Sequence, residues 1–158
     1  MLPSIPQPPL LETTVLLVRV EDRRGLSHLH VARSLNGLDQ WTLDPVPAMS
    51  PIEDDPYSAW GFEDARAVWV QDLERFAVTC TAYGPVGPSV HLAFTTNFVA
   101  FEHLGTVMPP ADKNAALFPR RINGMWVMLH RPITGNDRRA DVGCLDPWTS
   151  SAGGLLSR

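Results

Sequence analysis

Two adjacent acidic residues followed by an arginine form the segment of the sequence best suited to chemistry. Residues 60–66 read WGFEDAR and stand directly before an apolar run typical of a strand. If Arg66 neutralises one carboxylate, the other is free to exchange a proton, as a proton-donating carboxylic acid at the mouth of a sheet does. The alternative is a turn in which Glu63 and Asp64 cap backbone amides and Arg66 forms a surface ion pair. This segment alone leaves both interpretations open, and the turn is the simpler one.

Two further polar clusters stand at the ends of predicted strands, at residues 112–119 (DKNAALFP) and 130–132 (HRP). If the strand ends meet around one pocket, Lys113, Arg131 and Arg33 supply positive charge near a carboxylic acid. That combination suits an enzyme that protonates a leaving group while it holds an anion. The alternatives are a solvated turn for Lys113 and a half-buried, hydrogen-bonded side chain for His130.

The elements that must position these residues are short strands. Stretches rich in β-branched and apolar residues predict strands over residues 13–20, 26–34, 41–43, 65–71, 75–82, 89–96, 98–107, 115–122 and 125–130. Residues 45–56 are a proline-rich loop, and helical periodicity is absent. Short strands at near-regular spacing predict an all-β sandwich, barrel or propeller. Two similar units, at residues 30–41 and 91–101, favour the propeller because its blades repeat.

The composition and net charge of the sequence exclude several classes of function. The sequence has 158 residues, of which 44% are hydrophobic and 19% charged, and its net charge is -4, so we expect a globular domain without nucleic-acid partners. No apolar run is long enough to cross a bilayer and the N-terminus does not resemble a signal peptide, so we expect a cytoplasmic location and no membrane partner. Cys80, Cys144 and the histidines lack the spacing of metal ligands, which predicts no metal site.

The order of several motifs resembles glycoside hydrolase family 130. The motifs are GFEDAR at 61–66, TCTAY at 79–83, DKNAALFP at 112–119, NG at 123–124 and LHRP at 129–132. Upstream, LLVR at 16–19 and HVARS at 30–34 are similar to the family's first blade, so the resemblance covers residues 13–132. It implies a five-bladed β-propeller and the activity of the inverting β-mannoside phosphorylases, with some related β-mannosidases in the same family.

By this resemblance, Asp64 matches the acid of the family's Gly-x-Glu-Asp-x-Arg motif and is expected to protonate the glycosidic oxygen, in some members through a hydroxyl of the mannosyl ring. Phosphate then attacks the anomeric carbon from the opposite face and gives α-mannose 1-phosphate. Lys113, Asn114 and Arg131 fall on the family's phosphate-side positions. Cations take the place of the second carboxylate that an inverting hydrolase uses to activate water. The resemblance thus implies a β-mannoside oligosaccharide as substrate, inorganic phosphate as co-substrate and no cofactor.

The resemblance also suggests supporting roles. Arg33 is a fourth candidate for the phosphate side and His130 a helper there. Glu63 and Arg66 are expected to hold the loop and orient Asp64. Apart from the resemblance, Trp60 beside the motif is either a core residue, which is the commoner fate of tryptophan, or a platform on which a sugar stacks.

The sequence departs from the family pattern in three places. Ala65 stands where proline is usual, and residues 12–14 (ETT) replace an asparagine-containing entry. Family members are about twice as long, and similarity ends after residue 139. We therefore expect a proline-rich lead-in over residues 1–12, a partial propeller of two to three blades over residues 13–139, and a divergent, frameshifted tail over residues 140–158.

A partial propeller has a functional consequence, because unclosed blades expose sheet edges and favour association between copies of the chain. Two alternatives to an active phosphorylase follow. The chain is either a truncated fragment that is non-catalytic or binds sugar weakly, or part of a β-mannosidase. Linkage and aglycone specificity depend on loops that this sequence does not identify.

Overall fold

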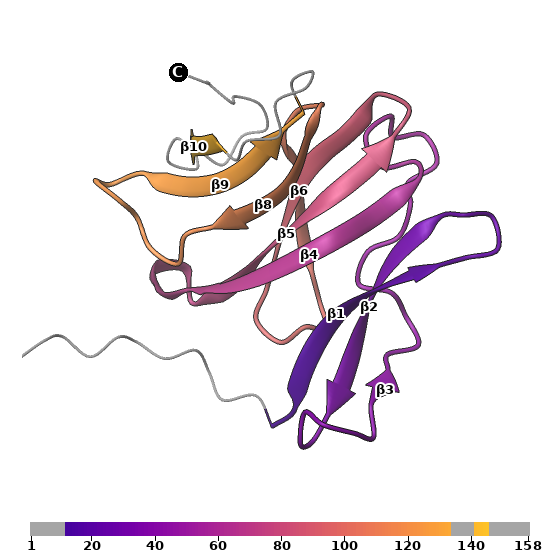
Figure 1. Ribbon diagram of the computed structural model, residues 1–158. Helices are drawn as coiled ribbons and strands as arrows, with labels where there is room; N and C mark the ends of the chain where they lie inside the picture. The colour runs from indigo at the N-terminus through magenta and orange to yellow at the C-terminus, as the bar shows by residue number, and fades with distance from the viewer. Residues whose placement is uncertain (1–11, 134–140, 146–158) are drawn as a thin grey trace, which may run out of the picture.

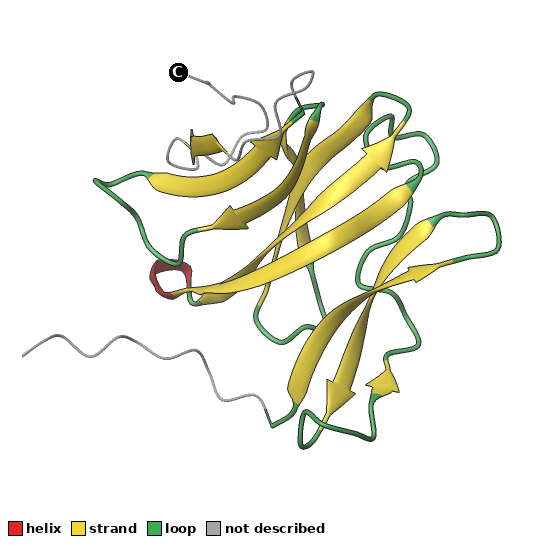
Figure 2. Cartoon of the chain, in the orientation of Figure 1, coloured by secondary structure: helices red, strands yellow, loops and turns green. Residues whose placement is uncertain are grey.

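The computed structural model describes residues 12–133 and 141–145 and has an all-β fold (Figures 1 and 2). The strands are β1 (Thr14–Glu21), β2 (Ser27–Ser34), β3 (Thr42–Leu43), β4 (Gly61–Val70), β5 (Arg75–Gly84), β6 (Gly87–Thr95), β7 (Glu102–Met108), β8 (Asp112–Leu117), β9 (Trp126–Pro132) and β10 (Asp141–Leu145). Helical structure in the described part is limited to one 3-10 turn, Gln71–Leu73. None of it is long and apolar enough to span a membrane.

The strands form two sheets. The larger has the order β1-β2-β4-β5-β6-β7, with β3 paired to β2, and the smaller has the order β10-β9-β8. β2 and β4 run parallel and meet through one pair of residues, Ser27 and Gly61. The larger sheet therefore consists of two antiparallel groups, β1–β3 and β4–β7, whose ladder is joined by one residue pair. In Figure 1 the first group extends away from the second, and β8 lies against β5 and β6.

The core lies on both faces of β5. Ala77 packs in the cluster against β8 and β9, which includes Trp126, whereas Val78 and Cys80 pack in the cluster against β2, which includes Leu29. Successive side chains of a strand point to opposite faces, so a strand that is covered on both sides has no polar face. This explains why residues 75–82 read as a nearly continuous run of small and apolar side chains.

The acidic motif lies inside a strand. β4 begins at Gly61 and not at residue 65, so the segment is neither a turn nor a stretch that precedes the sheet. Its pairing with β5 shifts register between Glu63 and Arg66, and Asp64 has a left-handed φ of 55°. This is a β-bulge, which leaves the strand continuous while it changes the direction of a side chain. The turn interpretation of the segment is therefore wrong.

Three other strands differ from prediction. β8 spans Asp112–Leu117 and not residues 115–122, so the DKN segment lies inside the strand. β7 begins at Glu102 and not at residue 98, because side chains bind the preceding turn: the Thr95 hydroxyl accepts from the amide of Phe98 at 2.9 Å, and the Asn97 side chain from that of Val99 at 2.9 Å. β10, which was not predicted, pairs with β9 inside the segment expected as a divergent tail. The lead-in, residues 1–11, lies outside the described residues.

Candidate active site

Two bulges of the same kind place the central polar side chains. The bulge of β4 comprises Asp64 and Ala65, and that of β8 comprises Asn114 and Ala115, each pair standing opposite one residue of the neighbouring strand. The first residue of each bulge is left-handed, with φ of 55° for Asp64 and 52° for Asn114. Aspartate and asparagine adopt this conformation more readily than other residues with a Cβ. A bulge re-aims its side chain, and these two turn toward each other.

Hydrogen bonds join the bulges to a cation on β9. The Asn114 Nδ2 donates to Asp64 Oδ2 at 2.9 Å, and Arg131 Nη2 donates to Asn114 Oδ1. The Asn114 backbone amide donates to the Thr81 hydroxyl of β5 at 3.2 Å, which fixes the bulge of β8 against the larger sheet. The side-chain amide of Asn114 therefore connects the Asp64 carboxylate on β4 with the Arg131 guanidinium on β9.

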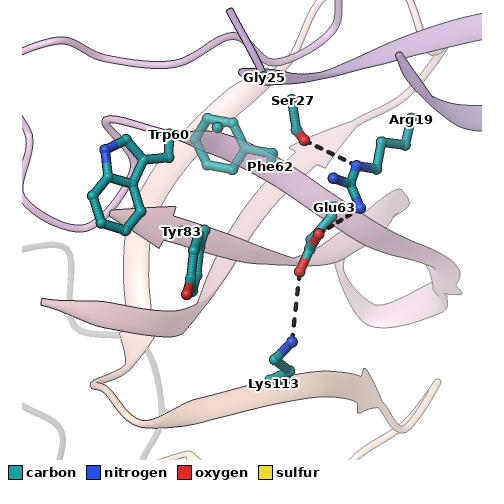
Figure 3. A pocket seen from close by; sticks show the side chains of 9 residues that line it. Arg19, Gly25, Ser27, Trp60, Phe62, Glu63, Tyr83 and Lys113 are labelled. Carbon is teal, nitrogen blue, oxygen red and sulfur yellow. Dashed lines mark hydrogen bonds and ion pairs between the residues drawn. The ribbon is translucent and has the colours of Figure 1, made fainter. Parts of the chain in front are cut away.

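Glu63 lies between two cations. Arg19 Nη1 is 2.8 Å from Glu63 Oε2, and Lys113 Nζ is 3.7 Å from Oε1 (Figure 3). The Arg19 Nε also donates to the Ser27 hydroxyl at 2.9 Å. The Glu63 side chain is only 18% exposed, and a carboxylate this shielded from water needs such partners. Through these two ion pairs Glu63 connects β4 with β1 and with β8.

A pocket of about 260 Å³ opens beside these charges. Its polar side carries Arg19, Glu63 and Lys113, and its apolar side carries Trp60, Phe62 and Tyr83 (Figure 3). The rings of Trp60 and Tyr83 have their centroids 5.2 Å apart, and the two residues are 44% and 41% exposed. Exposed aromatic faces next to hydrogen-bonding groups suit a ligand that has both apolar and hydroxylated faces.

A buried histidine supports the apolar side of the pocket. The His91 ring lies edge-on to Phe62, with centroids 5.1 Å apart, and His91 is 5% exposed. Burial lowers the pKa of His91 to about 4, with His103 adding to the effect. His91 is therefore neutral at physiological pH and packs as an aromatic ring.

The structure places six of the sequence-predicted site residues in two adjoining groups: Asp64, Asn114 and Arg131, which hydrogen bonds join, and Trp60, Glu63 and Lys113, which line the pocket. It also adds three that the sequence analysis did not assign: Arg19, Ser27 and Tyr83. The last residue of TCTAY was the only signal for Tyr83, and nothing in the LLVR segment indicated that Arg19 would bind Glu63.

Arg33 binds other groups than those of this site, and its role on the phosphate side stays a prediction. Its guanidinium donates to both carboxylate oxygens of Asp44, at 3.0 to 3.1 Å, and to the Phe98 carbonyl at 2.7 Å. It also lies six residues along β2 from Ser27, about 20 Å for an extended strand. Arg33 therefore holds a loop and a turn against β2.

Replacing Arg33 by methionine tests this structural role. We expect the free energy of unfolding to fall by about 1–3 kcal/mol, because Asp44 and the Phe98 carbonyl lose their donor. The matched control is Arg66→Met, which removes an exposed guanidinium and should change stability by less than about 0.5 kcal/mol. Urea unfolding of both variants measures the difference, and equal stability would contradict the role.

Arg66 and His130 also lie elsewhere than expected. The Arg66 side chain is exposed and forms no ion pair with the described residues. The cations that face Glu63 are Arg19 and Lys113. His130 Nδ1 bonds Asp112 Oδ2, and both side chains are nearly buried. Because neighbours in a strand point to opposite faces, His130 faces away from Arg131. In this structure His130 therefore does not face the side of β9 on which Arg131 lies, where the resemblance places phosphate.

Comparison with known proteins identifies the family. The sequence model of the glycoside hydrolase family 130 proteins, described as beta-1,4-mannooligosaccharide phosphorylase, matches residues 13–140. The chain belongs to this family. It is 33% identical over 133 residues to the beta-1,2-mannobiose phosphorylase of Listeria innocua, which covers 84% of this chain and 35% of the relative. It is 34% identical over 119 residues to the beta-1,4-mannooligosaccharide phosphorylase of Ruminococcus albus, covering 72% and 34%.

Solved structures agree with this membership. The structure of the Listeria innocua beta-1,2-mannobiose phosphorylase with beta-1,2-mannobiose matches with a TM-score of 0.67 and 30% identity, over 75% of this chain and 33% of that chain. A solved structure from the family's glycoside hydrolases that target beta-1,2 mannosidic linkages in Candida mannan matches with a TM-score of 0.65 at 20% identity, over 75% of this chain and 40% of that chain, which supports the fold alone. The chain thus spans about one third of the length of these two phosphorylases.

Proposed function

We propose that this chain carries the proton-donating and phosphate-holding part of an inverting β-mannoside phosphorylase, with Asp64 as the catalytic acid. One observation carries the proposal. Lys113 and Arg131 are cross-strand partners, so two cations project side by side, next to the residue that binds Asp64. Like charges directly opposite each other on a sheet are unfavourable. Glu63 offsets part of the Lys113 charge at 3.7 Å, whereas Arg131 binds the neutral Asn114 amide, so a further anion beside the two cations would be favourable. Phosphate is such an anion, and charge-assisted hydrogen bonds from both side chains would hold it.

The proposed reaction uses these groups in order. Asp64 gives its proton to the glycosidic oxygen, and the bond from that oxygen to the anomeric carbon breaks with its electron pair on the oxygen. A phosphate oxygen, held by Lys113 and Arg131, forms the new bond to the anomeric carbon from the opposite face. The products are α-mannose 1-phosphate and the shortened acceptor. No second carboxylate has to activate water, because the nucleophile is already an anion.

The aromatic wall of the pocket is proposed to bind the sugar. Trp60 and Tyr83 offer exposed ring faces, and Arg19 and Glu63 offer a charged hydrogen-bonding edge. A mannosyl ring has a face of C–H groups and a rim of hydroxyls that suit these two sides. The same arrangement requires no cofactor, since inorganic phosphate is the co-substrate.

The fold is proposed to be part of a five-bladed β-propeller. The groups β1–β3, β4–β7 and β8–β10 would then be three blades, within the two to three expected. The support is that β4 and β8, the first strands of their groups, lie in contact and carry equivalent bulges. In such an arrangement the first strands of the blades surround a central site, where the bulged residues stand.

Phosphate binding can be tested at Lys113, which is the only lysine in the sequence. We expect Lys113→Gln to raise the Michaelis constant for phosphate about 10- to 100-fold, because phosphate loses one charge-assisted hydrogen bond. The assay supplies a β-mannobiose and inorganic phosphate and follows α-mannose 1-phosphate by ³¹P NMR. The control is Arg24→Gln, which removes an exposed cation paired with Asp22, outside the pocket.

Two outcomes would overturn the proposal. Release of free mannose at a rate independent of phosphate would assign a β-mannosidase. A wild-type protein that forms neither mannose nor mannose 1-phosphate, yet binds mannobiose, would assign a sugar-binding fragment. The amine of Lys113 gives a readout without turnover: phosphate should protect it from an amine-reactive reagent, and equal labelling with and without phosphate would argue against an anion site there.

A further inference from the structure

We propose that Asn114 is a positioning residue that determines which oxygen of Asp64 carries the catalytic proton, and that Arg131 holds Asn114 in the orientation this requires. The inference rests on the proposed function of Asp64 as the acid. It assigns Asn114 a role other than contact with phosphate. The observation behind it is the chain of contacts from Arg131 through Asn114 to Asp64.

The first step is the orientation of the Asn114 amide. A guanidinium has only N–H donors, so the atom that faces Arg131 must be the acceptor of the amide, Oδ1. The NH₂ end is then left to face Asp64, where Nδ2 lies 2.9 Å from Oδ2. The reversed amide would place donor against donor at Arg131. The cation on β9 therefore fixes the direction of an amide on β8.

The second step concerns the Asp64 carboxyl. An amide N–H donates only to an oxygen with a free lone pair directed at it, so a proton on Oδ2 pointing along this contact would oppose the Asn114 donor. When Asp64 is protonated, its proton therefore resides on Oδ1. From there it can pass to the glycosidic oxygen while Oδ2 keeps the Asn114 bond throughout. The acid is thus oriented before the substrate arrives, and no side chain has to turn during the transfer.

The backbone holds Asn114 and Asp64 at a fixed spacing. Both residues are left-handed bulge residues, and the Asn114 amide nitrogen is fixed to the Thr81 hydroxyl at 3.2 Å. The Thr79 hydroxyl donates to the Ala115 carbonyl at 2.7 Å, so both residues of the β8 bulge are tied to β5. β5 also pairs with β4 on either side of its bulge. One strand therefore fixes the spacing between the acid and its positioning residue.

Asn114→Gly is the variant that tests the inference, because glycine accepts the left-handed φ and removes only the side chain. On an unactivated β-mannobiose with phosphate we expect turnover to fall by about 100-fold, within the range for a general acid, and the Michaelis constant for phosphate to stay unchanged. On 2,4-dinitrophenyl β-mannoside we expect a loss of less than about tenfold, because that leaving group departs without a proton. A merely structural defect would slow both substrates equally.

The matched control is Asn123→Gly. Asn123 is also left-handed, with φ of 52°, but it stands in the exposed turn between β8 and β9, so this variant should behave as wild type on both substrates. Asn114→Asp keeps the size and removes the donor, and it should show the same dependence on the leaving group. Equal losses on both substrates, or a raised Michaelis constant for phosphate with normal turnover, would overturn the inference.

A second readout needs no turnover and separates the inference from the proposed function. The side-chain amide resonances of Asn114, identified by their loss in Asn114→Gly, should shift in the Asp64→Asn variant and in Arg131→Met. They should not move in Asp72→Asn, which changes a distant surface pair with Arg121. Resonances that stay in place in Asp64→Asn and Arg131→Met would overturn the positioning chain even if phosphorolysis is observed. If these resonances shift in a protein that has no activity, the contacts from Arg131 through Asn114 to Asp64 are supported and the proposed reaction is contradicted.

Discussion

Asp64→Asn is expected to lower the phosphorolysis of an unactivated β-mannoside by about 10²–10⁴-fold, the range for removal of a general acid. Asparagine has the same size and accepts the left-handed φ of 55° at this position, so the bulge should remain. The variant keeps the Lys113 and Arg131 cations, so phosphate binding should not weaken. Steady-state kinetics with mannobiose and phosphate measures both quantities.

The control for this variant is Glu74→Gln, which neutralises another exposed, left-handed acidic residue, with φ of 49°, after the 3-10 turn. It should retain wild-type activity. Glu63→Gln gives a second comparison, because Glu63 is bound by Arg19 and Lys113 and is predicted to organise cations and not to donate a proton. If Glu63→Gln abolished activity while Asp64→Asn remained active, the assignment of the acid would be reversed.

Gly61→Ala is expected to destabilise the protein by about 2–4 kcal/mol, the sum of backbone strain and overpacking. Gly61 has φ of 108°, and an added Cβ would lie 1.9 Å from the Ser27 carbonyl oxygen. Ser27 and Gly61 are the only paired residues in the ladder between β2 and β4 of the described chain, so the methyl group would push the β1–β3 group away from β4. Urea unfolding measures the loss of stability.

Activity should fall in the same Gly61→Ala variant, because Gly61 lines the pocket and Arg19 reaches Glu63 from β1. The matched control is Gly105→Ala, where φ is 91° but nothing lies within 4 Å of the added Cβ. That variant isolates the backbone strain and should lose only about 1 kcal/mol. Equal destabilisation of the two variants would show that the contact with Ser27 is not responsible.

The strands of this fold could be predicted from sequence because local patterns determine them. The β-branched and apolar runs identify β1, β2, β5, β6 and β9 to within a few residues. The grouping of Asp64, Lys113 and Arg131 was predicted through the family motifs and not through spacing, since 49 residues separate Asp64 from Lys113. Their order along the chain carries no information about which strands lie in contact.

The bulges and the ion pairs could not be predicted, for physical reasons. Asp64 and Ala65 have side chains that suit a regular strand or a turn, and only the pairing of β4 with β5 shows that the register shifts there. Arg33 and Arg19 lie on neighbouring strands, each directly after an apolar residue, yet one binds Asp44 and the other Glu21 and Glu63. Which acid an arginine reaches depends on tertiary distances, and sequence types alone do not supply them.

The most direct test is a crystal structure of the Asp64→Asn variant with inorganic phosphate and a β-mannobiose, in which turnover is slow enough to keep both bound. The account predicts phosphate oxygens within hydrogen-bond distance of Lys113 Nζ and the Arg131 guanidinium. It also predicts the glycosidic oxygen next to the side chain at position 64, on the side away from Asn114, with a mannosyl ring against Trp60 or Tyr83. Phosphate bound away from Lys113 and Arg131, or a glycosidic oxygen that faces Glu63, would contradict it.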